Sequence, residues 1–444
     1  MADRAFPLGA AVLAVALCAL LLVPLAALGV QSGGLTAGAW ALSAAELAAV
    51  RFTVWQALLS AALSTALAVP VARALARRRF AGRGAVIAAL GAPFLLPAIV
   101  AVLGLLAVFG RAGWANQALG LLGLPPVSIY GLQGVVLAHV FFNMPLAVRL
   151  ILQGWQAVPA ERFRLAASLG FAPADIARHI ERPMLREVLP GAALVIFVIC
   201  LTSFAVALTL GGGPRATTME LAIYQALRFE FDLPRAARLA LLQFGLSALA
   251  FGLATWLTLP AGFGGGLDRV GKAPAPGGWR RVADTVVIGL ACALVALPVL
   301  AVALRGAPGM MTLPPEVWAA AARSVMVALA SAMLALTAGL VLALAAGTGR
   351  KWPGLTATLP LAASSLVLGT GLFLIVQPFV RPSGLALPVT VLVNATLALP
   401  FAYRVLAPEA RSLQADYGRL AASLGLTGWP WLRWVILPRL RRPL

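Results

Sequence analysis

Ten long apolar stretches run through this sequence, and they constrain its fold more than any other feature. Each holds roughly 20 residues or more, which is the length that a helix needs to cross about 30 Å of hydrocarbon. A helix satisfies its own backbone hydrogen bonds in that environment, so the stretches predict an all-α polytopic membrane protein. The predicted spans are Leu8–Val30, Phe52–Ala72, Gly84–Gly110, Gly131–Leu152, Val188–Leu210, Ala237–Leu259, Asp284–Leu304, Arg323–Gly347, Leu355–Gln377 and Pro388–Leu406.

The charge content agrees with a membrane protein. Charged residues make up 11% of the 444 residues, against about 25% in soluble proteins. The 34 Lys and Arg exceed the 14 Asp and Glu, which gives a net charge of +20. A nucleic-acid-binding domain gathers its basic residues on a soluble face, whereas here they lie in short loops between apolar runs. Composition therefore excludes a soluble protein and gives no support for a nucleic-acid partner.

The basic residues also predict the orientation, because positively charged loops stay on the cytoplasmic side. A cytoplasmic N-terminus would place 25 of the 34 basic residues in inner segments and the other nine outside. The first apolar run is longer than the core of a signal peptide, so we expect it to be a retained span. The three cysteines lie apart in apolar runs and indicate neither a disulfide nor a metal site.

The two halves of the sequence repeat each other. The segment Arg164–Gly170 recurs letter for letter as Arg419–Gly425, at a shift of 255 positions. At the same shift Glu161 aligns with Asp416. Six predicted spans separate the equivalent points, and an even number predicts parallel repeats with the transport route between them.

The repeat also predicts the domain organisation. We expect a first repeat over 1–259, a cytoplasmic linker over 260–283 and a second repeat over 284–444, because Pro260–Gly278 is rich in Gly and Pro. The first copy continues through two more spans after its duplicated motif, whereas the second ends directly after it. We therefore expect the sequence to lack about 70 residues and two spans of the second repeat, as a fragment or a truncated variant.

Each copy carries a cytoplasmic segment, about 153–187 and 407–444, with a helix, a glycine and a second helix. Gly170 and Gly425 follow short Ala-rich helices, and glycine is the residue best suited to a left-handed helix stop. Leu165 and Leu169 share one face of the first helix, with Ala166 and Ala167 beside them. Such an apolar ridge in a loop that faces water predicts a covering partner protein. The alternative, an ordinary amphipathic connector, is disfavoured by the duplication.

This pattern resembles the EAA loop of ABC importer permeases, which runs EAA, three residues, Gly, nine residues, Ile, any residue, Leu, Pro. Two positions depart from it: Arg164 and Arg419 stand where the family has Glu, and Arg182 replaces the Leu. The resemblance implies that both segments couple the chain to an ATPase. The residues it assigns to that role are Glu161, Arg164, Leu165, Ala166, Ala167, Leu169, Gly170, Ile180, Pro183, Asp416, Arg419, Leu420, Ala421, Ala422, Leu424, Gly425, Val435 and Pro438.

Two further stretches, Tyr130–Leu146 and Ser203–Leu227, resemble the fused two-half thiamine permease of Gram-negative bacteria. The resemblance covers most of the chain. It implies the type I importer fold in the inner membrane, with two halves forming the pore. A periplasmic thiamine-binding protein would deliver thiamine or its phosphates. Two copies of an ATPase subunit would bind the two helix–glycine–helix segments, which we call the elbows. ATP and Mg²⁺ would bind to that subunit, so this chain would be neither an enzyme nor a cofactor carrier.

Three alternatives remain open: the same machine with another substrate such as ferric iron, an ion-coupled secondary carrier, and a non-transporting scaffold. Carboxylates fall in loops or at the ends of predicted spans, which disfavours ion coupling. The nearest approach to a phosphate loop, Gly266–Ala273, has Ala where Ser or Thr would hold Mg²⁺. We therefore expect the energy to come from a separate subunit.

Four polar residues are candidates for the pore or the substrate path. His139 and Asn143 lie one turn apart within a predicted span, where they could line the pore or hydrogen-bond between helices. Glu220 and Tyr224 follow a Gly-rich outer segment, where they could guide or stack the thiazolium cation of thiamine. The alternative for this segment is a solvated loop that contacts the delivery protein.

Prolines fall inside several predicted spans and are expected to break or kink them. They are Pro70, Pro93, Pro97, Pro145, Pro298, Pro360 and Pro400.

Overall fold

The computed structural model describes residues 5–33, 41–211, 213, 216–257, 278–347, 349–380, 382–426 and 428–440. Over these ranges the chain forms helices and turns and no strand. Within the described ranges nine helices are long and apolar enough to cross a membrane, or ten if one bent pair is counted as a single span. The predicted all-α polytopic class is confirmed.

The first repeat contains five long helices, which are α1 (Ala5–Gln31), α2 (Ala44–Arg77), α7 (Leu132–Ala157), α10 (Arg182–Leu201) and α13 (Leu233–Leu257). Between them lie shorter helices and single turns of 3₁₀ or π type. These are α3 (Arg83–Ala89), α4 (Ala92–Leu95), α5 (Ala98–Phe109), α6 (Trp114–Leu121), α8 (Ala160–Ser168), α9 (Pro173–Ile176), η3 (Ala177–Glu181), α11 (Phe204–Leu210), α12 (Met219–Gln225) and η5 (Ala226–Glu230).

The second repeat has three long helices, which are α14 (Trp279–Gly306), α15 (Pro315–Gly347) and α18 (Pro382–Ser423). Its predicted linker, Pro260–Gly278, lies outside the described residues apart from Gly278. Helix α14 begins at Trp279, which lies before the expected start of the second repeat at residue 284. The shorter elements are η6 (Ala307–Thr312), α16 (Trp352–Thr358), η7 (Leu359–Ala362), α17 (Ser365–Val376), α19 (Trp429–Trp431), η8 (Leu432–Ile436) and α20 (Leu437–Leu440).

Three of the ten predicted spans are not single helices, and two of them break near prolines that were expected to break or kink them. The span at 84–110 is divided into α3, α4 and α5, because Pro93 and Pro97 supply no backbone N–H. The span at 355–377 bends by 90° between η7, which contains Pro360, and α17. Pro70, Pro145, Pro298 and Pro400 instead lie inside continuous helices.

The third broken span, at 188–210, is divided at Thr202 into α10 and α11 without a proline. Amide side chains from two other helices bind the carbonyl groups at this break. Gln56 Nε2 on α2 donates to the Cys200 carbonyl at 3.0 Å, and Gln243 Nε2 on α13 donates to the Leu201 carbonyl at 2.9 Å. These two bonds satisfy acceptors that lose their partners where the helix ends.

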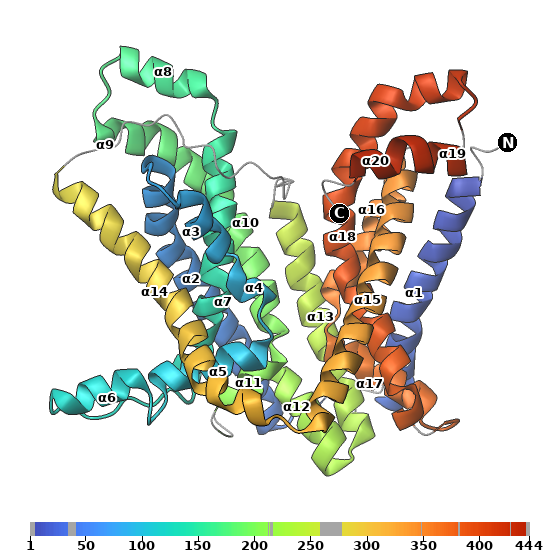
Figure 1. Ribbon diagram of the computed structural model, residues 1–444. Coiled ribbons are helices and arrows are strands. Elements are labelled where there is room, and N and C mark those ends of the chain that lie inside the picture. The colour runs from blue at the N-terminus through green and yellow to red at the C-terminus, as the bar shows by residue number, and fades with distance from the viewer. Residues whose placement is uncertain are drawn as a thin grey trace.

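The first helix of each repeat packs on the other repeat (Figure 1). Helix α1 lies against α15, α16 and α17 of the second repeat and against α13 of the first, so most of its neighbours belong to the second repeat. Helix α14 lies against α2 and α5 of the first repeat, and Ala291 and Val295 of α14 belong to the core around α2, α7 and α10. Exchange of the two opening helices therefore holds the halves together.

Each exchanged helix carries a proline that packs against a glycine on a helix of the other repeat. A Cβ on Gly104 of α5 would lie 2.5 Å from the carbonyl oxygen of Pro298 on α14. A Cβ on Gly371 of α17 would lie 2.6 Å from the Cβ of Pro24 on α1. Only glycine allows these helices to approach so closely. The same contact therefore occurs at both exchanges.

Alanine at Gly371 is expected to destabilise the protein by about 1–3 kcal/mol, because the new methyl group collides with α1. Gly369, on the same helix, serves as the matched control, since a Cβ added there would meet no other atom within 4 Å. Alanine there is expected to be neutral or to stabilise by up to about 1 kcal/mol. The measurement is the midpoint of thermal unfolding in detergent; equal midpoints for the two variants would contradict the contact.

Candidate functional site

The first elbow is built from α8, a glycine turn and α9. Gly170 has a φ of +68°, as predicted for a left-handed stop. Its N–H donates to the Ala167 carbonyl at 3.1 Å, and the Phe171 N–H donates to the Ala166 carbonyl at 2.9 Å. These two bonds form a Schellman motif, which ends the helix and reverses the chain.

A small apolar core fixes the two arms of this elbow. Phe163 and Ala166 of α8 pack with Ile176 and Ile180, and all four are buried. Two residues assigned to coupling, Ala166 and Ile180, therefore lie inside the elbow, whereas Ala167 is exposed. Pro183 is exposed in the first turn of α10.

The second elbow repeats the glycine turn but not the break before it. Gly425 has a φ of +65°, and the Leu426 N–H donates to the Ala421 carbonyl at 2.8 Å. Helix α18 runs without interruption through its 42 residues into the elbow, so the separate short helix expected before Gly425 was wrong. In the first copy Pro159 separates α7 from α8, and the second copy has Gln414 at the same shift of 255.

Both elbows lie at the same end of the molecule, at the top of Figure 1, which we call the elbow end. Each presents two exposed leucines on its first arm. Leu165 and Leu169 are 61% and 62% exposed, and Leu420 and Leu424 are 56% and 64% exposed. The structure thus carries the predicted apolar ridge twice, at one end, with no described residue covering either copy.

Charged residues flank the ridges. Arg164 and Glu161 form an exposed salt bridge of 2.6 Å on α8. On the second elbow Asp416 accepts a hydrogen bond of 3.2 Å from the Ser412 hydroxyl, and Arg419 is exposed. On the arm of this elbow that follows Gly425, which we call its second arm, Val435 is half-buried and Pro438 is exposed. The ridges therefore combine apolar side chains with charges at their edges, as protein interfaces do.

A buried carboxylate that sequence reasoning missed fastens the first elbow to the bundle. Glu181, in the π-helical turn η3, is 3% exposed and lies 2.9 Å from Arg73 and 2.5 Å from Arg77 of α2. At the other end of α2, Glu46 is 1% exposed and pairs with Arg235 and Arg238 of α13. Helix α2 is thus fixed at both ends by buried ion pairs.

The second elbow has an apolar counterpart of this anchor. The π-helical turns Ala177–Glu181 and Leu432–Ile436 correspond at the shift of 255. Ile436 therefore takes the place of Glu181, and it is fully buried beside Leu342, Ala343 and Ala346 of α15. The sequence does hold a signal for Glu181: it aligns with an isoleucine in the other repeat, and an apolar residue at that position indicates that the position is buried.

His139 and Asn143 lie in the packed interior of the first half. His139 Nδ1 is 3.1 Å from the Ser60 hydroxyl on α2, and the Asn143 amide donates to Cys200 Sγ on α10 at 3.4 Å. Their side chains are 3% and 2% exposed. The geometry brings both residues together as bridges between helices, which is the second of the two roles considered for them.

Glu220 and Tyr224 lie on the short helix α12, near the end opposite the elbows. The alternative of a solvated loop was wrong for the described residues around Glu220, because Met219–Ile223 is buried. Glu220 is 1% exposed, and no basic side chain among the described residues forms a salt bridge with its carboxylate. Glu220 is therefore a buried carboxylate that lies outside the candidate spans. Tyr224 packs against Phe204 and Phe229, at ring-centroid distances of 5.1 and 5.7 Å.

Burial raises the pKa of the Glu220 carboxyl to about 8 from an ordinary value of 4.5, and the Ser364 hydroxyl offsets part of this rise. Helix α12 is not among the candidate spans. Between about pH 4.5 and 8 the folded protein keeps a proton that the unfolded chain has lost, so stability falls as the pH rises through this window.

Glutamine at Glu220 is expected to remove that dependence, because it stays neutral at every pH. The measurement is the thermal unfolding midpoint in detergent from pH 5 to 9. The unsubstituted protein should lose stability across this range, and Glu220→Gln should lose less. Exposed Glu316 on α15 offers the matched control, and Glu316→Gln should keep the original slope. If the thermal midpoints of all three proteins changed with pH in the same way, the raised pKa of the Glu220 carboxyl would be contradicted.

Comparison with known proteins gives three informative similarities. No family model matches the chain. The chain is 41% identical over 422 residues to the thiamine transport system permease protein ThiP of Salmonella typhimurium, covering 89% of this chain and 76% of that protein. It is 34% identical over 411 residues to the protein of the same name in Haemophilus influenzae, with coverages of 89% and 76%. It is also 30% identical over 182 residues to the molybdenum transport system permease protein ModB of Azotobacter vinelandii, covering 41% of this chain and 80% of ModB.

Proposed function

The chain belongs to the family of thiamine transport system permease proteins, and we propose that it is the membrane-spanning subunit of an ATP-driven importer for thiamine or its phosphates. The observation that carries this proposal is the similarity over 89% of the chain to permeases named for thiamine transport. The duplicated elbow supports the same conclusion independently, because a permease driven by two ATPase subunits needs two equivalent docking elements.

The two elbows are the proposed binding sites for a pair of ATPase subunits. Their leucine ridges are exposed, lie at one end of the molecule and are related by the sequence repeat. Buried Phe163 and Ile176 give the first elbow a rigid interior, so a force on its ridge is transmitted to α9 and α10. Glu181 extends this connection to α2. Closure of the ATPase pair would thereby move helices of both halves.

The elbow end is proposed to face the cytoplasm, with the N-terminus on the same side. The arginine distribution supports this orientation, since 25 of the 34 basic residues then lie in inner segments. ATP and Mg²⁺ would bind to the separate ATPase subunit. A periplasmic thiamine-binding protein would then deliver its ligand at the opposite end, where α6, α11 and α12 lie.

The substrate assignment favours thiamine over a metal or an oxyanion. The similarity to the molybdenum permease covers 41% of this chain, whereas the similarity to thiamine permeases covers 89%. An ion-coupled carrier is disfavoured because both relatives are named as permeases of transport systems and the elbows provide for a separate motor.

Uptake of labelled thiamine by cells that lack their own importer tests the proposal. Uptake is expected only when this chain is expressed together with its ATPase and binding protein. Valine at Gly170 and Gly425 should reduce uptake, because both glycines have positive φ and a β-branched residue is strained there. Uptake without the ATPase would identify an ion-coupled carrier, and uptake of labelled ferric iron in place of thiamine would overturn the substrate assignment.

A further inference from the structure

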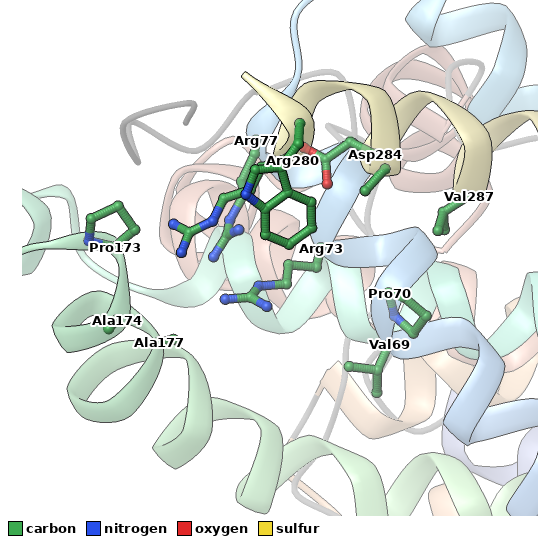
Figure 2. Close-up of a pocket in the computed structure, with 12 residues that line it drawn as sticks. Val69, Pro70, Arg73, Arg77, Pro173, Ala174, Ala177, Arg280, Asp284 and Val287 are labelled. Atoms are coloured by element: carbon green, nitrogen blue, oxygen red, sulfur yellow. The ribbon is translucent and has the colours of Figure 1, made fainter. Parts of the chain in front are cut away.

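A cavity of about 440 Å³ opens at the elbow end between three elements of the fold. Its walls are the end of α2, the second arm of the first elbow, and the start of α14 (Figure 2). It therefore lies where the exchanged helix of the second repeat meets the elbow of the first. The proposed transport function does not use this cavity.

Three arginines line the cavity and give it an excess of positive charge. The guanidinium groups of Arg73, Arg77 and Arg280 lie on one side of it, across from the wall formed by Ala174 and Ala177 (Figure 2). Small side chains on that wall leave the cavity open in front of the guanidinium groups.

The acidic residues nearby balance only part of this charge. Glu181 is shared by Arg73 and Arg77, and Asp284 is paired with Arg78 at 2.6 Å. Among the described residues no carboxylate lies within salt-bridge distance of Arg280, whose guanidinium stands 5.8 Å from the ring of Trp279. With Arg78 included, four arginines face two carboxylates, so the cluster holds two more positive than negative charges. An anion in the cavity would neutralise this excess of positive charge.

We propose that this cavity binds a phosphate group, and that an anionic phospholipid supplies it. Guanidinium groups match phosphate oxygens in charge and in the geometry of their paired N–H donors. Basic pockets between membrane helices are a recognised way to hold anionic lipid headgroups. The site thus has the donors for a phosphate without any further side chain.

The surroundings favour a lipid over a soluble phosphate. Trp279, the first residue of α14, is 75% exposed, and tryptophan concentrates at the boundary between headgroups and hydrocarbon. Val282, Val286 and Leu290 follow at intervals of four residues and are 64%, 52% and 66% exposed. They form an apolar stripe on α14 that runs away from the cavity, along which acyl chains can lie. The bound lipid would then link α2, the elbow and the exchanged α14.

Arg280 is the position at which to test the site, because its removal leaves the buried pairs of Glu181 intact. The purified full chain in a neutral detergent is titrated with short-chain phosphatidylglycerol, short-chain phosphatidylcholine or inorganic phosphate, and the thermal unfolding midpoint is followed. Phosphatidylglycerol is expected to raise the midpoint in a saturable manner. Arg280→Gln should increase the half-saturating concentration about tenfold, since it removes a charge-assisted contact. Arg281→Gln, which changes the neighbouring arginine outside the cavity, should leave that concentration unchanged.

Three outcomes would overturn the proposal or part of it. An equal response to phosphatidylcholine would show that the headgroup charge is irrelevant. An equal loss in Arg280→Gln and Arg281→Gln would show general attraction to a basic surface. Saturation by inorganic phosphate at the same concentration as by phosphatidylglycerol would retain the anion site but overturn the lipid as its source. None of these results depends on thiamine transport, so failure here is distinguishable from failure of the proposed function.

Discussion

Aspartate at both Leu165 and Leu169 is expected to abolish capture of the ATPase subunit at the first elbow. Each leucine is more than 60% exposed in this chain, so the proposed partner would bury it on binding. Burial of a leucine stabilises a complex by about 1.5–3 kcal/mol, so the loss of two weakens binding at least about a hundredfold. Two carboxylates in a dry interface weaken it further. The measurement is co-purification of the ATPase with the tagged chain.

Aspartate at Leu420 and Leu424 should have the same effect at the second elbow, and the four substitutions together should eliminate co-purification. Leu121 and Leu122 give the matched control, since they are 91% and 73% exposed at the opposite end of the molecule. Aspartate there should leave capture of the ATPase unchanged. The elbow variants should keep their thermal midpoints, because none of the four leucines is buried. Full capture by the fourfold variant would refute the docking assignment.

Alanine at Glu181 is expected to destabilise the protein by about 3–5 kcal/mol. The change leaves Arg77 charged and only 9% exposed without its carboxylate, and a buried unpaired charge is costly. Arg73 is 39% exposed, so water compensates much of its loss. The measurement is the free energy of unfolding in denaturant, or the thermal midpoint where unfolding is irreversible.

Two comparisons distinguish the buried pair from ordinary surface charge. Glu161→Ala removes an exposed salt bridge on α8 and should cost less than about 1 kcal/mol. Replacing the whole cluster by apolar residues, as Glu181→Ile with Arg73→Met and Arg77→Met, should restore most of the lost stability. This variant imitates the second half, where Ile436 occupies the equivalent position. A loss for Glu181→Ala no larger than that for Glu161→Ala would exclude the anchor.

Local features of the elbows could be predicted from the sequence. A glycine after a short Ala-rich helix predicts a left-handed stop, and both Gly170 and Gly425 have it. Spacing of i and i+4 placed Leu165 and Leu169 on one face, and both are exposed. These features depend on a few neighbouring residues, so sequence reasoning reaches them without knowledge of the rest of the fold. Whether the ridge binds an ATPase stays a prediction.

Features that join distant parts of the chain could not be predicted in this way. Glu181 meets Arg73 and Arg77 across about 100 positions of sequence. The break at Thr202 has no proline to announce it, and the groups that bind its carbonyls, Gln56 and Gln243, come from distant helices. The buried position of Glu220 depends likewise on how α12 packs against α2, α13 and α17.

The exchange of opening helices has a consequence for biogenesis. Helix α1 leaves the ribosome well before α15, α16 and α17, which it packs against and which are synthesised about 300 residues later. At about 5–20 residues per second, α1 waits in the bilayer for tens of seconds before these three neighbours are made. α1 and α14 are the two most apolar of the nine candidate spans, so α1 can reside alone in lipid during that interval. Completion of the second half then recruits it.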